Sequence, residues 1–163
     1  MPQNDKDLLL RLQQHSVEFT IIGGVCGVLH GVSLVTQVLD VCIRLTAENL
    51  RRIEAAVKDL HPFHRLAANQ LPLKLTDDLC GRLKNLYLQT DFGTLDCLGE
   101  VAGIGDYEQV YKRSVIHTMS YGEFRILDID ALIEAKEKVG RERDIAAVKQ
   151  LRAIKERNQQ RKK

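Results

Sequence analysis

The chain has 163 residues, 44% of them hydrophobic and 28% charged, which is typical of a globular protein and allows one domain with a sizeable core. No apolar run approaches the roughly 20 residues that cross a bilayer, and the first residues lack the pattern of a secretory signal, so we expect a cytoplasmic protein. Cys26, Cys42, Cys80 and Cys97 form no C-x-x-C pair, which predicts buried, reduced thiols.

Charge is unevenly distributed along the chain. The formal net charge is +2, but residues 134–163 alone carry a net charge of +6. A basic C-terminal element of this kind can hold phosphates or nucleic acid, and it can equally be a solvated helix face. We expect a single domain over residues 1–156 and a basic, frayed tail over residues 157–163.

The first half of the chain predicts alternating helices and strands. Leu8, Leu9 and Leu12 recur at helical spacing, so we expect an amphipathic helix over 5–15. Apolar and β-branched runs predict strands over 18–22 and 38–45, separated by a short helix over 24–30. Thr46 is a typical N-cap for a further helix, which Pro62 terminates.

The second half of the chain predicts two hairpins and then two helices. We expect a short helix within 75–83, a first hairpin within 85–101, a helix over 106–112, a second hairpin within 115–127, and helices over 128–140 and 141–160. Because helices and strands are mixed along the chain, the fold class is α+β, or mixed α/β, with a mixed sheet.

The pair Gly23-Gly24 lies between a predicted strand and a predicted helix. Such a turn can aim backbone N–H groups at an anion, at the positive end of the helix. It is neither a Walker loop nor a G-x-G-x-x-G fingerprint. Taken alone, the two glycines are better explained by a tight strand-to-helix turn with no ligand.

Two acids, Asp40 and Asp96, stand inside otherwise apolar strands. A carboxylate in such a place is costly unless it is paired, lies at the strand end or holds a metal. If the two strands are neighbours, both carboxylates can point into one cleft and bind Mg²⁺ through oxygen. Val38 faces the same side as Asp40, since residues i and i+2 of a strand share a face. A D-x-D pair there would complete a three-carboxylate site for two cations, and Val38 removes one ligand.

This order of motifs resembles the nucleotidyltransferase superfamily, which has the DNA polymerase β-like fold. Members of that superfamily have a G-G or G-S turn, then D-x-D or D-x-E on the next strand, then a third acid on a later strand. Here the corresponding segments are Gly23-Gly24, V-L-D at 38–40 and L-D-C-L-G at 95–99. The segment L-I-E-A-K-E-K-V-G-R-E-R-D at 132–144 is similar to the K-x-x-x-x-R-x-x-D segment of small bacterial nucleotidyltransferases of the abortive-infection and toxin–antitoxin type.

The resemblance covers about residues 19–151 and implies a mixed sheet flanked by helices, with further helices at the C-terminus. By position, Gly23 and Gly24 would hold a nucleoside triphosphate, and Asp40 and Asp96 would bind Mg²⁺ or Mn²⁺. Asp96 would also help to activate the attacking hydroxyl. The superfamily has an acid where this chain has Val38, so the resemblance supports the fold better than the activity.

The same resemblance implies that Lys136 and Arg141 contact the nucleotide phosphates. It also implies that Asp144 either orients one of these two basic side chains or joins the acidic site. These basic residues also have a simpler explanation. Glu134 with Lys138, and Glu137 with Arg141, are i,i+4 pairs that would stabilise any exposed helix. His30, on the short helix, is expected to be a packed or capping residue.

Three functions fit these patterns. The first is transfer of a nucleotidyl group from a nucleoside triphosphate to a hydroxyl of RNA, protein or a small molecule, weakened by Val38. The second is a catalytically inactive binding or regulatory module, such as a sensor or a toxin–antitoxin partner. The third, RNA binding by the basic C-terminal helix, lacks a set of aromatic residues for stacking on bases, since aromatics make up 5% of the chain.

Overall fold

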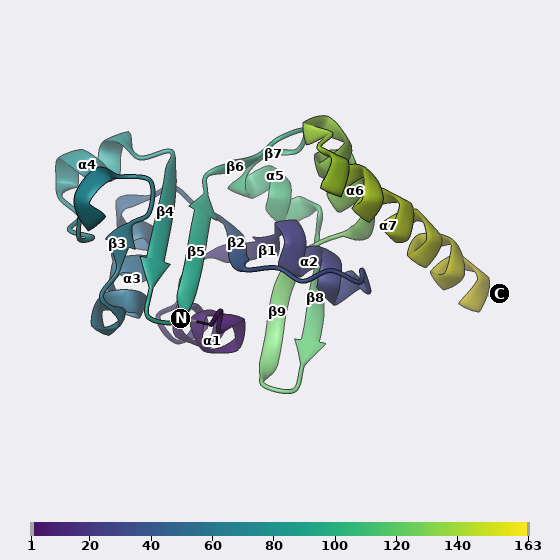
Figure 1. Cartoon of the computed structure of the whole chain (residues 1–163), viewed down its shortest axis with the longest axis horizontal. Coiled ribbons are helices and arrows are strands. Elements are labelled where there is room, and N and C mark those ends of the chain that lie inside the picture. Colours follow the sequence, from purple (N-terminus) through teal and green to yellow (C-terminus); the bar gives the residue numbers. More distant parts are fainter. Residues whose placement is uncertain (1, 163) are drawn as a thin grey trace.

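The computed structural model describes residues 2–162, and in this part of the chain a seven-stranded mixed sheet forms the centre of the molecule (Figure 1). The strand order is β3-β4-β5-β2-β1-β9-β8. The strands are β1 (Phe19–Ile22), β2 (Val38–Ile43), β3 (Phe63–His64), β4 (Asn85–Thr90), β5 (Gly93–Leu98), β8 (Ser114–Met119) and β9 (Gly122–Leu127). A separate two-stranded ribbon joins β6 (Glu100–Val101) to β7 (Gly105–Asp106).

Parallel pairing is confined to two places in this sheet. β5 runs parallel to β2, and β9 runs parallel to β1, whereas β1 and β2 are antiparallel neighbours. β4 with β5 and β8 with β9 are the two hairpins that the sequence predicts. The central strands β2, β1 and β5 therefore bring together segments from distant parts of the chain.

Helices cover the sheet and extend beyond it. They are α1 (Asp5–Gln14), α2 (Gly23–His30), α3 (Ala47–Val57), α4 (Asp77–Arg82), α5 (Tyr107–Lys112), α6 (Ile129–Val139) and α7 (Glu142–Arg161), with short 3₁₀ turns at Lys58–Leu60 and Ala68–Gln70. α1 packs against α3, while α2 packs against β1, β2, α6 and α7. In Figure 1 the C-terminal part of α7 runs away from the sheet.

Side chains at the helix ends explain why the helices begin where they do. Thr46, Thr76, Asp106 and Asp128 each accept a hydrogen bond from a backbone N–H in the first turn of the following helix. Gly31 and Gly140 end α2 and α6 in the left-handed conformation.

The α+β fold class with a mixed sheet is confirmed, and each predicted helix and strand is present within a few residues. α7 continues through Arg161, past residue 157, where the sequence analysis starts a frayed tail. The short strands β3 and β7 have no counterpart among the predicted elements, and β6 lies at the end of the segment predicted as the first hairpin. Within residues 2–162, none of the helices combines the length and the apolar character that crossing a membrane requires.

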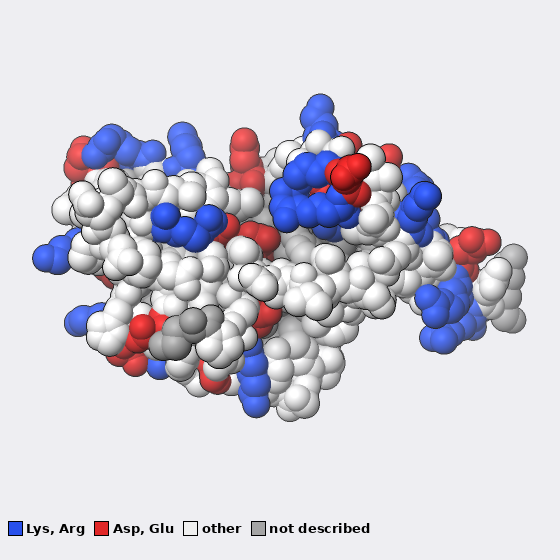
Figure 2. Space-filling view, viewed as in Figure 1, with Lys and Arg blue, Asp and Glu red and all other residues white. Residues whose placement is uncertain are grey.

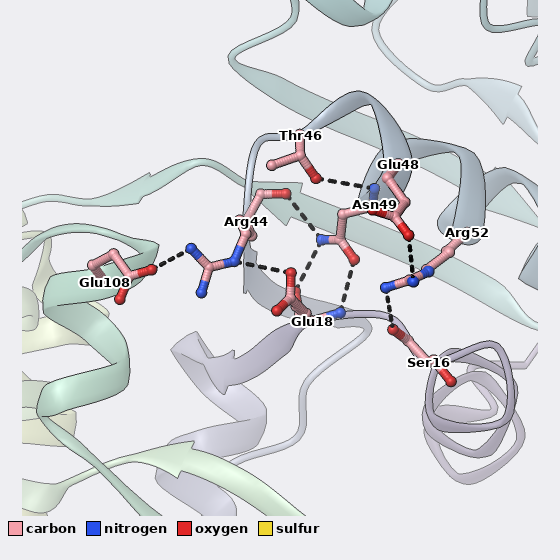
Figure 3. A network of polar contacts seen from close by, with 8 residues as sticks. All are labelled: Ser16, Glu18, Arg44, Thr46, Glu48, Asn49, Arg52 and Glu108. Carbon is pink, nitrogen blue, oxygen red and sulfur yellow. Dashed lines mark hydrogen bonds and ion pairs between the residues drawn. The ribbon is translucent and has the colours of Figure 1, made fainter.

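A polar network fixes the junction between β1, β2 and α3 (Figure 3). The buried Asn49 accepts a hydrogen bond from the backbone N–H of Glu18 at 2.8 Å and donates to the backbone oxygens of Glu18 and Arg44 at 3.0 and 2.9 Å. The guanidinium of Arg44 in turn bonds the carboxylates of Glu18 and Glu108. One side chain thus joins three backbone groups at the strand ends that border α3.

Replacing Asn49 with alanine is expected to lower the free energy of unfolding by about 2 kcal/mol, since three buried backbone groups would lose their partner. Arg52→Ala, at an exposed position of the same network, is the matched control and should cost well under about 1 kcal/mol. Urea denaturation of the two variants measures both values. Equal losses in the two variants would contradict the assigned role of Asn49.

Candidate nucleotide-binding pocket

A row of side chains crosses the sheet at one level and on one face. Asp40 on β2 lies opposite Asp96 on β5, and Asp96 lies opposite Tyr87 on β4. Directly opposed residues of neighbouring strands share a face, so the two carboxylates point to the same side. On the view of Figure 2, acidic side chains lie near the centre of the molecule with basic side chains on either side. Asp40 and Asp96 thus meet as the sequence predicts for two acids on neighbouring strands.

The glycine turn lies against Asp40. Gly23 has a φ of +66°, and a Cβ atom built on it would stand 2.6 Å from Oδ2 of Asp40. A Cβ on Gly24 would stand 3.2 Å from Oγ1 of Thr36. Glycine at position 23 is therefore required by both the backbone conformation and the nearness of the carboxylate. The N-cap of α2 is Ile22, whose aliphatic side chain cannot accept the hydrogen bonds of the first-turn N–H groups.

These groups line one pocket of about 770 Å³ between the sheet, α2, α6 and the start of α7. The pocket contains all seven residues that the resemblance points to, together with Val38 and two further arginines. Its charged lining consists of Asp40, Asp96, Asp144, Arg65, Lys136, Arg141 and Arg143. Apolar side chains, among them Leu34 and Val35 of the α2–β2 loop, form another part of its wall.

The charge of Asp40 is unfavourable in this row, and Asp96 is incompletely hydrogen-bonded. Burial, and then the neighbouring charge of Asp96, raise the pKa of Asp40 from 3.8 to about 6, although Arg65 and Lys136 act in the opposite direction. Asp96 accepts a hydrogen bond from Arg65 on Oδ2, while its buried Oδ1 has no hydrogen-bond partner among the described residues. An added cation would relieve both features.

Because the pKa of Asp40 is higher in the folded protein than in the unfolded chain, its ionisation costs stability as pH rises from about 4 to about 6. Asp40→Asn is therefore expected to stabilise the metal-free protein by about 2 kcal/mol at pH 8 and by almost nothing at pH 4. Urea denaturation at the two pH values, with a chelator present, measures this difference. A gain of the same size at both pH values would contradict it.

Lys136, Arg141 and Asp144 form a second charged group at the pocket wall. Asp144, which is buried, accepts from Nε of Arg141 at 2.7 Å and from Nη2 at 3.3 Å, and Nζ of Lys136 lies 3.8 Å away. Burial raises the pKa of Asp144, but the bonds from Arg141 and the charge of Lys136 together bring it below 3.8. Burial lowers the pKa of Lys136, and Asp144 partly offsets this.

This arrangement differs from the i,i+4 pairs that the sequence left open as an explanation. Glu134 pairs with Arg113, and Glu137 pairs with Arg152. Arg141 lies between the two C-terminal helices, as the N-cap of α7. Asp144 thus pairs with both of these basic residues.

Sequence reasoning did not identify Arg65 or Arg143 as site residues. Arg65 follows the two-residue strand β3, which is too short to show the alternation that marks a strand. Arg143 lies in the segment similar to the K-x-x-x-x-R-x-x-D pattern, at a position which that pattern leaves unspecified. No sequence signal was available for Arg65, whereas the basic character of the 134–163 segment pointed towards Arg143.

Other candidate groups have structural partners. Nε2 of His30 lies 2.8 Å from the backbone oxygen of Leu127, which fits a packed residue. His61 pairs with Asp91 at 2.6 Å on the exposed side of a separate pocket near α3. The four cysteines are buried and free. Within residues 2–162, no three His, Cys, Asp or Glu side chains are grouped so that they could hold a metal ion.

No protein-family model matches the sequence, and the comparison with curated proteins gives no match. Solved structures do match the fold. A presumed nucleotidyltransferase from Thermotoga maritima is 15% identical, with 89% of this chain and 88% of that one covered, at a TM-score of 0.57. The lincosamide antibiotic adenylyltransferase LnuA, bound to lincomycin, is 13% identical over 94% of this chain and 99% of its own, at a TM-score of 0.64.

A third similar structure is ANT(2'')-Ia in complex with adenylyl-2''-tobramycin. It is 14% identical, with 96% of this chain and 95% of that chain covered, at a TM-score of 0.54. The matches span nearly the whole of each chain, so they concern the complete arrangement of sheet and helices. The chain has the nucleotidyltransferase fold, as the sequence resemblance implied.

Proposed function

We propose that the protein binds a nucleoside triphosphate and one divalent cation, Mg²⁺ or Mn²⁺, in this pocket and transfers a nucleotidyl group to a hydroxyl acceptor. The acceptor is an RNA, a protein or a small molecule. The observation that carries the proposal is the register of β2 with β5, which sets Asp40 beside Asp96 next to the glycine turn. The names of LnuA and ANT(2'')-Ia link this fold to adenylyl groups and antibiotics.

The carboxylates present suit a single hard cation. Carboxylate oxygens are the ligands that Mg²⁺ and Mn²⁺ prefer. Asp96, directly opposite Asp40 on the neighbouring strand, keeps one buried oxygen, Oδ1, without a hydrogen-bond partner among the described residues. Val38 supplies no ligand where a third carboxylate would complete a two-cation site. The cation, when bound, would supply positive charge to the phosphate that is transferred.

The remaining roles follow from the position of each side chain in the pocket. The N–H groups at Gly23 and Gly24, at the start of α2, would hold the triphosphate. Lys136, held by Asp144, would neutralise phosphate charge at the opposite wall. The acceptor hydroxyl would attack the α-phosphorus and release pyrophosphate, and Asp96 would take the proton of that hydroxyl. Val38 would leave the reaction slow.

Calorimetric titration with each of the four nucleoside triphosphates, in Mg²⁺ and then in Mn²⁺, tests the proposal. We expect one bound nucleotide per chain, and at least a tenfold weaker affinity in Asp40→Asn, since the cation would lose one of its two carboxylates. Asp78→Asn, an exposed acid on α4, is the matched control and should bind as the parent does. No binding of any of the four nucleotides would refute the proposal.

Val38 favours one alternative, a catalytically inactive nucleotidyltransferase-fold module that acts as a sensor or a toxin–antitoxin partner. Such a module would bind the nucleotide through the glycine turn and Lys136 without turnover. Transfer from a labelled nucleoside triphosphate to RNA, to protein or to small hydroxyl compounds separates the two. Binding without transfer to any acceptor would favour the module.

A further inference from the structure

Arg65 reaches the carboxylate row from the neighbouring part of the sheet. Its backbone N–H donates to the backbone oxygen of Tyr87 at 2.9 Å, which fixes the chain just beyond β3. Its guanidinium passes over the ring of Tyr87, with 5.6 Å between the guanidinium carbon and the ring centroid. Nη2 then bonds Oδ2 of Asp96 at 2.5 Å. The positive charge therefore lies beside the acid that would bind a cation.

The pair of Arg65 with Asp96 is incomplete as a structural ion pair. Nε of Arg65 and Oδ1 of Asp96 are both buried and have no hydrogen-bond partner among the described residues. The pair of Arg141 with Asp144 in the same pocket engages both carboxylate oxygens instead. Because buried polar atoms are costly when unpaired, a donor and an acceptor left open in one pocket indicate a place for a ligand.

The net charge of the pocket also favours a ligand that is not a pair of divalent cations. Three carboxylates and four basic side chains line it, so that its formal charge is positive before any cation is added. A site that relied on two divalent cations would need a surplus of carboxylates. Here one acid is missing, at Val38, and a guanidinium stands next to another acid.

We propose that Arg65 takes the place of a second divalent cation: its guanidinium holds one oxygen of Asp96 and offers positive charge to the phosphates of the nucleotide, so that the pocket works with one cation. This inference rests on the proposed function and deepens it. The guanidinium N–H groups of Arg65 that do not bond Asp96 would face the bound phosphates, while Oδ1 of Asp96 would bind the single cation shared with Asp40.

The test compares the affinities of Arg65→Gln for Mn²⁺ and for nucleotide. Free Mn²⁺, counted by electron paramagnetic resonance without nucleotide, should show at least tenfold tighter binding in the variant, since a positive charge beside Asp96 is removed. Calorimetry with ATP, GTP, CTP and UTP in saturating Mn²⁺ should show at least tenfold weaker nucleotide binding. Arg65→Lys, which keeps the charge, should stay close to the parent in both measurements.

Tighter Mn²⁺ binding together with weaker nucleotide binding in Arg65→Gln distinguishes a cation-like role of Arg65 from a purely structural role. If both affinities fall in Arg65→Gln, or if neither changes, the inference is overturned. If Arg65→Gln shows no cooperative thermal unfolding and is therefore not folded, Arg65→Met takes its place, because methionine keeps the aliphatic packing over Tyr87. Arg82→Gln, on the exposed side of α4, is the control for loss of one positive charge and should change neither affinity.

Failure of the proposed function gives a different result. If the parent binds none of the four nucleotides in Mn²⁺, the proposed function is refuted, and the Mn²⁺ measurement alone decides on Arg65. Tighter Mn²⁺ binding in Arg65→Gln then supports the guanidinium as a cation substitute at Asp96. Unchanged or weaker Mn²⁺ binding overturns it.

Discussion

Val38→Asp is expected to convert the pocket into a three-carboxylate site, to tighten Mn²⁺ binding at least tenfold and to raise the rate of nucleotidyl transfer about 100-fold. Val38 lines the pocket on the same face of β2 as Asp40, and Thr36 fixes its backbone through bonds to both Val38 N and Val38 O. A new carboxylate there adds an oxygen ligand where charge develops in the transition state. A decrease of about 3 kcal/mol in the activation free energy corresponds to the expected 100-fold increase in the transfer rate.

Val38→Asn has a similar shape without the charge and is the matched control, so it should leave the affinity for Mn²⁺ near that of the parent. Without metal, Val38→Asp should melt at a lower temperature than the parent, because three carboxylates would repel one another. Added Mn²⁺ should restore the loss. If Val38→Asp binds Mn²⁺ no better than the parent, the pocket is not a metal site and the inactive module becomes the better description.

Replacing both Lys136 and Arg141 with alanine is expected to lower the free energy of unfolding by about 3 kcal/mol, in addition to weakening nucleotide binding. Asp144 is 2% exposed, and these two side chains are its cationic partners. Removing both leaves a buried carboxylate without compensation, which is among the more costly single-site defects. Urea denaturation at pH 7 measures the loss.

Two further variants test this explanation. Lys138→Ala with Arg157→Ala removes two exposed charges from the same helices and should change stability by less than about 1 kcal/mol. Adding Asp144→Leu to the Lys136 and Arg141 double variant removes the orphaned charge and should recover most of the lost stability. If the triple variant is no more stable than the double variant, the burial of Asp144 does not explain the loss.

The sequence alone identifies the acidic residues at the centre of the site, because the patterns that mark them are local. Asp40 and Asp96 are unusual in apolar strands, and the period of two in a strand places Val38 on the same face as Asp40. What no local pattern gives is which strands are neighbours. The resemblance to nucleotidyltransferases assigned both acids to one metal site, and in the structure β2 and β5 are paired neighbours.

The remaining parts of the site depend on tertiary contacts. Arg65 reaches Asp96 across Tyr87, from a stretch of chain whose composition predicts only a loop. Lys136 and Arg141 read as surface residues on a charged helix, and only the packing of α6 against α7 shows that they enclose Asp144. Helical periodicity identifies the face of a helix, but it does not identify the partner of that face.

The parallel pairing of β2 with β5 also governs how the chain reaches its folded state. The two hairpins close over short loops, whereas Asp40 and Asp96 meet only after a long segment containing α3, β3 and α4 has been brought round. Closing such a loop is entropically costly, and non-local pairing slows folding. We therefore expect the hairpins to form first and the carboxylate row late. A substitution in the 44–84 segment that slows this meeting would reduce the yield of folded protein without altering the carboxylates themselves.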